Sequence, residues 1–144
     1  NLPMHEGRAS DLTRVEAVKP TILELSHRGA KVLLLAHFGR PKGQRHSTMS
    51  TSVVQGDLER VLGREVMFVS EVAGPVVQQS LSIFRPGDIG LLDNVRFWPG
   101  EEANDPAFAQ SITENADFYV NDAFSAAHRA HATTEGLAHL LPAY

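Results

Sequence analysis

The chain has 144 residues, 42% of them hydrophobic and 21% charged, which is typical of one soluble globular domain with its own core. It contains no cysteine, which excludes disulfides and thiolate metal sites and fits a reducing, cytoplasmic location. The formal net charge of −4 excludes an overall basic field that would attract nucleic acid, so any anion site must be local. No apolar run approaches the roughly 20 residues of a membrane-spanning helix, and we expect no membrane partner.

The first quarter of the chain is expected to form a loop, two short helices and a strand. Residues 1–8 are predicted to be a loop, and a short helix follows from about residue 10. Pro20 breaks or kinks this helix and can serve as the first residue of a second one. Gly29 is a natural residue to end that second helix. The unbroken apolar run over residues 32–36 reads as a strand buried on both faces.

Helices and strands alternate over the remaining residues. We predict helices that end at Gly63, that begin at Pro75 and that begin at Asp105-Pro106, and strands at residues 66–69, 89–92 and 118–120. Such alternation indicates right-handed βαβ crossovers. The predicted fold class is therefore α/β, with a parallel sheet and helices on both faces in three layers.

Three arginines each follow a predicted buried strand by a few residues: Arg40, Arg96 and Arg129. Ligands of open parallel sheets bind in the crevice at the carboxyl ends of the strands, so these guanidinium groups can point into one crevice. Arg14, at the start of the first helix, can join them. Four such groups would repel one another unless a polyanion lay between them. Jointly they predict an anion site, although each arginine taken alone could also be an ordinary surface residue.

The histidines leave two interpretations open. His128 and His131 are three residues apart and on a helix could chelate a metal, with His37 or Asp122 as a third ligand. The neighbouring Arg129 disfavours a cation, so we favour hydrogen bonding of the histidines to phosphate or carboxylate oxygens. We therefore predict no metal site.

Other features of the sequence indicate no chemistry of their own. The glutamates Glu101 and Glu102 are interpreted as part of a solvated acidic loop. The chain has neither a Gly-x-x-x-x-Gly-Lys-Ser/Thr nor a Gly-x-Gly-x-x-Gly segment. It also lacks a nucleophile and base at convincing spacing. We predict no nucleotide site in this chain.

Four segments resemble those of phosphoglycerate kinases, in the family's order. Residues 36–43, Ala-His-Phe-Gly-Arg-Pro-Lys-Gly, resemble the family's Ser-His-Leu-Gly-Arg-Pro. Residues 92–97, Leu-Asp-Asn-Val-Arg-Phe, resemble its Glu-Asn-Leu/Val-Arg-Phe, and residues 100–106 resemble its next loop. Residues 120–132 are similar to its Val-Asn-Asp-Ala-Phe-Gly-Thr-Ala-His-Arg-Ala-His. Together these segments extend over essentially the whole chain.

The resemblance implies a two-lobed glycolytic kinase that moves a phosphoryl group reversibly between 1,3-bisphosphoglycerate and ADP, giving 3-phosphoglycerate and ATP. In that family a Rossmann-like amino-terminal lobe holds the glycerate substrate, and the carboxy-terminal lobe holds Mg-ADP or Mg-ATP. Residues 1–144 resemble only the amino-terminal, 3-phosphoglycerate-binding domain. We therefore expect no bound cofactor and no activity in this chain alone, and a monomeric, cytoplasmic parent enzyme.

The resemblance also implies which residues contact the substrate. They are Asn1, Arg14, His37, Phe38, Gly39, Arg40, Arg96 and Arg129, with His128 and His131 in support. Arg14 is the implied catalytic residue, because it would lie nearest the transferring phosphoryl group.

The chain departs from the family's pattern at two places. Ser125-Ala126 stand where the family has Gly-Thr. The family also has a strand that ends in Arg-x-Asp-x-Asn, of which only Asn1 is present here. That strand is expected to be central in the sheet, so we expect a truncated lobe that self-associates through the gap or is unusually labile. Two other functions stay open: a stand-alone anion-binding module, and a metal-dependent hydrolase that uses His37, His128 and His131.

Overall fold

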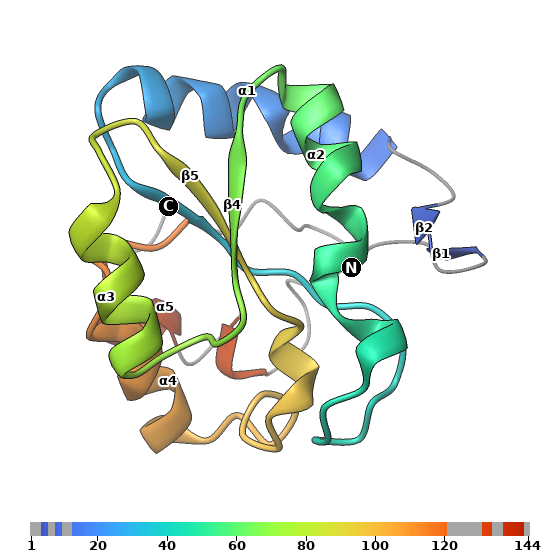
Figure 1. Ribbon diagram of the computed structural model, residues 1–144. Helices are drawn as coiled ribbons and strands as arrows, with labels where there is room; N and C mark the ends of the chain where they lie inside the picture. The colour runs from blue at the N-terminus through green and yellow to red at the C-terminus, as the bar shows by residue number, and fades with distance from the viewer. Residues whose placement is uncertain (1–3, 6–7, 10–12, 121–130, 134–136, 143–144) are drawn as a thin grey trace.

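The fold was analysed in a computed structural model of the chain (Figure 1). The structure describes residues 4–5, 8–9, 13–120, 131–133 and 137–142.

Three parallel strands form the centre of the molecule. They are β3 (Val32–Leu34), β4 (Val66–Val69) and β5 (Ile89–Leu92), in the spatial order β3-β5-β4. All four residues of β5 are buried, as expected for a central strand of a parallel sheet. The predicted strands at 66–69 and 89–92 are confirmed with the same bounds. The predicted strand at 32–36 is shorter and ends at Leu34.

Helices cover both faces of this sheet (Figure 1). Helices α1 (Thr13–His27) and α2 (Gln55–Leu62) pack on one face, and α3 (Pro75–Ile83) and α4 (Pro106–Thr113) lie on the other. Side chains of β5 alternate between the faces: Leu91 joins the apolar cluster of α1 and α2, whereas Leu92 joins that of α3. This confirms the predicted three-layer α/β class. The remaining short elements are β1 (Met4–His5), β2 (Arg8–Ala9), α5 (Leu137–Leu140) and the 3₁₀ helices η1 (Ser47–Met49), η2 (Thr51–Val54) and η3 (Val95–Phe97).

Helix α1 corrects the prediction of two short helices. It runs unbroken through Pro20. Val15 and Ile22, on either side of the proline, are only 4% and 5% exposed and pack against the sheet. Each such burial contributes about 1.5–3 kcal/mol, which together offsets the roughly 3 kcal/mol that an interior proline costs a helix. Gly29 follows the helix with a φ of 89°, in the terminating role that the sequence predicts.

Two other predicted segments also need correction. Residues 1–8 are not entirely loop, because β1 pairs antiparallel with β2. The predicted strand at 118–120 is reduced to a single bridge residue, Tyr119, whose backbone N–H donates to the carbonyl of Pro142 at 2.9 Å. Among the described residues, no strand pairs with the side of β3 that faces away from β5. A strand needs a neighbouring ladder for its backbone groups, and residues 118–120 lack one in this sheet.

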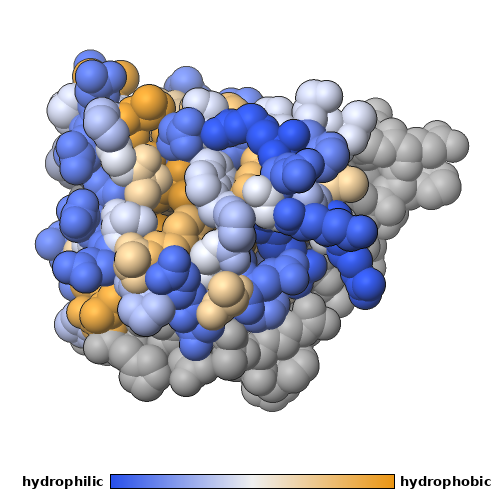
Figure 2. Space-filling model, turned by 90° about the horizontal axis from the view of Figure 1, so that it is seen from below, coloured by the Kyte–Doolittle hydropathy of each residue, from blue (hydrophilic) through white to orange (hydrophobic). Residues whose placement is uncertain are grey.

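A large apolar groove lies beside β3, on the side where no described strand pairs with it. Its volume is about 1050 Å³, and it is lined by side chains of α1 and β3, by residues 115–120, and by Leu137 and Leu141. The surface at the carboxyl ends of the strands differs from this groove in its hydropathy. Seen from that end of the sheet, hydrophilic residues occupy much of the described surface, beside a strip of hydrophobic ones (Figure 2).

The close packing of β5 generates a prediction. A Cβ on Gly90 would come within 2.7 Å of Phe84 Cε2 and 3.3 Å of Leu33 Cδ2. We expect Gly90→Ala to destabilise the fold by about 1–3 kcal/mol, because this buried strand has no room for a methyl group. Gly56→Ala is the matched control: a Cβ there meets nothing within 4 Å, and alanine favours a helix by about 1 kcal/mol. Urea unfolding of both variants measures the difference, and equal midpoints would contradict the expectation.

Candidate anion-binding site

Two loops at the carboxyl ends of neighbouring strands form the described part of the candidate site. Residues 35–46 follow β3, and residues 93–98 follow β5. Because β3 and β5 are hydrogen-bonded neighbours, their loops emerge side by side at the carboxyl ends of the strands. The backbone N–H of Val95 donates to the carbonyl of Ala36 at 3.1 Å, which joins the two loops at their base.

Asn94 holds the loop after β3 in place. Its side chain is fully buried, and Nδ2 donates to the carbonyls of Phe38 and Met49 at 2.9 and 3.0 Å. Its Oδ1 accepts from the backbone N–H of Arg96 at 3.0 Å. One amide thus ties together the loop that carries His37 to Arg40, the end of η1 and the loop that carries Arg96.

Asp93 makes the corresponding connection to η2. Its Oδ1 accepts hydrogen bonds from Ser50 Oγ, Thr51 N and Asn94 N at 2.9, 3.0 and 2.8 Å. Thr51 Oγ1 in turn donates to the carbonyl of Leu92 at 2.8 Å. The carboxylate therefore connects the start of η2 to the end of β5, and it also accepts the backbone N–H of Asn94.

Arg96 contacts the loop after β3 directly. The residue is only 9% exposed, and its Nη1 donates to the carbonyl of Gly39 at 3.2 Å. Gly39 has a φ of 69°, and a Cβ there would lie 3.3 Å from Met49 Sδ. A glycine allows this left-handed turn without strain. The structure thus brings Arg96 to the His37–Arg40 segment.

The other predicted residues of this segment differ in exposure. Arg40 is exposed and His37 is half-buried, lining the apolar groove. Phe38 is 5% exposed, so its ring belongs to the interior, while its carbonyl is the group that Asn94 holds. Of these residues, Arg40 is therefore the one whose side chain is open to solvent at the end of the strands.

Several predicted site residues fall wholly or partly outside the described part of the chain. Arg14 is placed in the first turn of α1, but its side chain is not described. Asn1, Asp122, His128 and Arg129 lie outside the described residues. The convergence of four arginines on one crevice therefore stays a prediction where Arg14 and Arg129 are concerned.

Glu101 corrects the interpretation of residues 101–102 as a solvated loop. Glu102 is exposed, but Glu101 is only 1% exposed. Its Oε1 accepts from Thr133 N and Oγ1 at 2.9 and 2.8 Å. Burial raises the pKa of Glu101 above the ordinary value of 4.5, while the hydrogen bonds from Thr133 and the positive charges of His131 and Arg96 oppose the rise. Two adjacent glutamates carry no local signal that one of them is buried, so sequence reasoning missed it.

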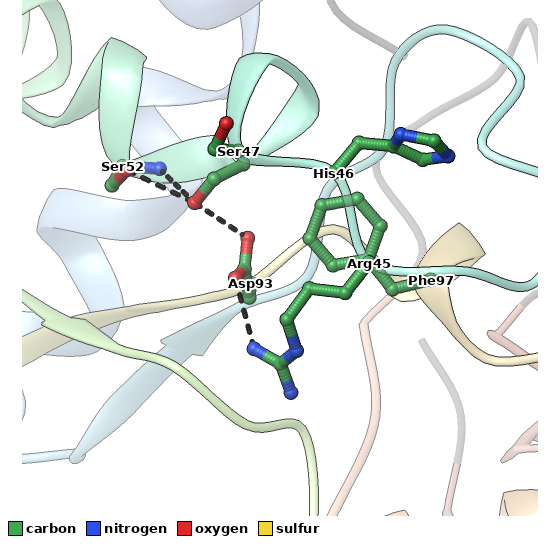
Figure 3. A pocket seen from close by; sticks show the side chains of 7 residues that line it. Arg45, His46, Ser47, Ser52, Asp93 and Phe97 are labelled. Atoms are coloured by element: carbon green, nitrogen blue, oxygen red, sulfur yellow. Dashed lines mark hydrogen bonds and ion pairs between the residues drawn. The ribbon is translucent and has the colours of Figure 1, made fainter.

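Sequence reasoning also assigned no role to Arg45, which closes the loop after β3. A hollow of about 410 Å³ lies beside it, between His46, the serines of η1 and η2, Asp93 and Phe97 (Figure 3). Arg45 Nη1 donates to the carbonyl of Ser70 at 2.9 Å, and Nη2 to Glu71 Oε1 at 3.1 Å. Its guanidinium lies 5.3 Å from the centroid of the Trp98 ring. Donors of this guanidinium are thus already hydrogen-bonded to other groups of the protein.

Two kinds of feature are absent from the described ranges. No group of three or more His, Asp or Glu residues there is arranged to hold a metal ion. No helix in the same ranges combines the length and hydrophobicity needed to cross a membrane.

The buried amide of Asn94 generates a second prediction. We expect Asn94→Ala to destabilise the fold by about 2–4 kcal/mol, because the carbonyls of Phe38 and Met49 and the N–H of Arg96 lose their partner in a buried site. Gln79→Ala, which removes an exposed amide from α3, is the control and should change stability by less than about 0.5 kcal/mol. Thermal and urea unfolding test this. A loss no larger for Asn94→Ala than for Gln79→Ala would refute the proposed link.

The profile of the phosphoglycerate kinase family matches residues 1–144. Two curated relatives illustrate the similarity. The phosphoglycerate kinases of Sphingopyxis alaskensis and Methylobacterium radiotolerans are 58% and 54% identical to this chain over 144 residues, which make up 100% of this chain and 36% of each relative.

Solved structures agree with this relationship. The crystal structure of phosphoglycerate kinase from Pyrococcus horikoshii OT3 matches with a TM-score of 0.86 and 28% identity, over 99% of this chain and 36% of that one. The enzyme from Coxiella burnetii matches with a TM-score of 0.84 and 32% identity, over 99% and 35% of the two chains. The chain thus spans about a third of the length of these relatives. Because the family profile matches it from end to end, the chain belongs to the phosphoglycerate kinase family.

Proposed function

We propose that residues 1–144 are the 3-phosphoglycerate-binding, amino-terminal domain of a phosphoglycerate kinase. The complete enzyme would move a phosphoryl group between 1,3-bisphosphoglycerate and ADP. The observation that carries the proposal is the placement of Arg96. This nearly buried guanidinium is hydrogen-bonded to Gly39, beside the exposed Arg40, at the carboxyl ends of two parallel strands. Such an edge is where α/β folds bind ligands, and guanidinium groups suit the phosphate and carboxylate of this substrate.

We assign the Mg-nucleotide to a part of the kinase beyond these residues. The sequence contains no phosphate-cradling glycine loop. The described residues offer no cluster of carboxylates or histidines that could hold a metal ion. We further propose that the complete kinase is cytoplasmic and monomeric, and that this chain by itself binds the glycerate substrate without turning it over.

The proposed site has one cation held by the protein and one exposed to solvent. Arg96 has its backbone held by Asn94 and its guanidinium held by Gly39, so little side-chain freedom is lost when it binds an anion. Arg40 is exposed and has to be ordered by the ligand. Arg14, Asn1, His37 and Arg129 complete the proposed contacts, with His128 and His131 in support. Phe38 and Gly39 shape the loop.

Titration with 3-phosphoglycerate tests the glycerate site. We expect Arg40→Ala to weaken binding to this chain about ten- to a hundredfold, as for the loss of one contact to a charged group. Arg28→Ala is the control, because Arg28 lies directly after α1 and pairs with Glu24 at 2.8 Å. NMR titration measures both affinities and their salt dependence. If the two variants bound 3-phosphoglycerate equally well, the assignment of Arg40 would fail.

The proposed catalytic role of Arg14 is tested in the full-length kinase that contains this chain. Phosphoryl transfer depends on positioning and on stabilising charge on the moving group. We propose that Arg14 contacts that group, so Arg14→Ala should lower kcat by about 10²–10³-fold. Arg129→Ala should mainly raise KM for the glycerate substrate, because its contact is the same before and during transfer. Steady-state kinetics separate the two, and a raised KM with unchanged kcat in Arg14→Ala would exclude the catalytic role.

We also propose that the isolated chain self-associates through the groove beside β3. The groove is apolar and borders β3, which is an edge strand among the described residues, a combination that promotes association between chains. Light scattering should detect dimers or larger species. Phe118→Lys, which puts a charge on the groove wall, should reduce them, whereas Ile83→Lys should not, because Ile83 is 76% exposed and does not line the groove. A monomer at all concentrations would contradict the proposal.

A further inference from the structure

Glu101 is a buried carboxyl that joins two separate segments of the chain. Its Oε1 accepts from both the backbone N–H and the hydroxyl of Thr133, at 2.9 and 2.8 Å. Its backbone carbonyl accepts from the N–H of Ala132 at 2.8 Å. Three hydrogen bonds to one residue thus fix two consecutive residues of a segment 31 and 32 positions further along the chain.

The position of Glu101 is itself set by the loop that follows β5. Its N–H donates to the carbonyl of Trp98 at 3.2 Å, which closes a turn directly after η3. Gly100 lets this turn pack tightly on α4, because a Cβ there would lie 2.6 Å from Phe108 Cβ. The turn is therefore anchored at both ends, to the loop that carries Arg96 and to a helix.

The segment that Glu101 holds leads directly to predicted substrate contacts. His131 is adjacent to Ala132, and Arg129 precedes Ala132 by three residues. Tyr119 Oη donates to the carbonyl of Thr133 at 2.6 Å, which is a further contact to the same segment.

A carboxyl group at position 101 requires a reason, because burial of this group is costly. Glu101 Oε2 has no hydrogen-bond partner among the described residues. An apolar side chain would avoid that cost, but it could not accept from both donors of Thr133. The carboxyl group fixes the position of Thr133, although its own Oε2 atom is left without a hydrogen bond from the described residues.

We propose that Glu101 is a positioning residue for the glycerate side of the reaction. It holds Ala132 and Thr133, which follow the proposed contacts Arg129 and His131 in the sequence, against the loop that contains Arg96. This inference rests on the proposed function. Glu101 itself does not contact substrate, and its effect is transmitted through Ala132 and Thr133.

The experiment uses the full-length kinase with the substitutions Glu101→Ala, Glu101→Gln and Thr133→Val. We expect Glu101→Ala to raise KM for 3-phosphoglycerate about ten- to a hundredfold, as for a displaced substrate contact, with KM for Mg-ATP unchanged. Glu101→Gln keeps an acceptor for Thr133 and should restore KM to within about threefold of the original value. Thr133→Val removes one donor and should raise the same KM by a smaller factor. Glu114→Ala, an exposed glutamate at the end of α4, is the control.

The outcomes separate this inference from the proposed function. If the unsubstituted full-length protein does not phosphorylate 3-phosphoglycerate with Mg-ATP, the proposed function fails. If it does, and Glu101→Ala leaves KM for 3-phosphoglycerate unchanged or raises KM for both substrates equally, the positioning role is overturned. If Glu101→Ala does not fold, Thr133→Val decides: a raised KM for 3-phosphoglycerate alone supports the role, and an unchanged KM overturns it.

Discussion

The buried amide of Asn94 is the contact on which the candidate site depends. It stands two residues after the end of the central strand, and it has donors on one side and an acceptor on the other. In an interior of low dielectric constant each unmade hydrogen bond is costly, so the two loops have one favourable arrangement relative to each other. Asp93 reinforces that arrangement by binding the start of η2. The position of Arg96 follows from these contacts.

The polar contacts form a continuous path from β5 to the segment around Thr133. Asn94 holds the backbone of Arg96, Arg96 Nε lies 3.5 Å from Oε1 of Glu102, and the neighbouring Glu101 holds Thr133. The apolar core acts differently, because it fixes the sheet between two helical layers and so fixes where the path begins. Packing of the sheet and positioning of the site loops thus depend on different groups. A variant such as Gly90→Ala tests the first, whereas Glu101→Ala tests the second.

Much of the fold could be predicted from the sequence, because its signals are local. The strand at 66–69 is a short apolar run, and Asp105 with Pro106 is a helix start whose geometry depends on those two residues. The candidate site could be predicted only as a set of cations at strand ends. The amide and carboxyl groups that position them could not, since Asn94 and Glu101 acquire their roles from partners that are distant in sequence.

The sequence by itself determined the α/β class, the bounds of β4 and β5 and the expectation of an arginine-rich anion site, because periodicity and strand-to-loop spacing are properties of short segments. Only the tertiary structure decided that α1 continues through Pro20, since burial on both sides of the proline outweighs its local cost. Only the tertiary structure reduced the strand at 118–120 to one bridge, since a strand exists only where a neighbour completes its ladder. The same reason explains the burial of Glu101: its environment is made by Thr133, which no local pattern connects to it.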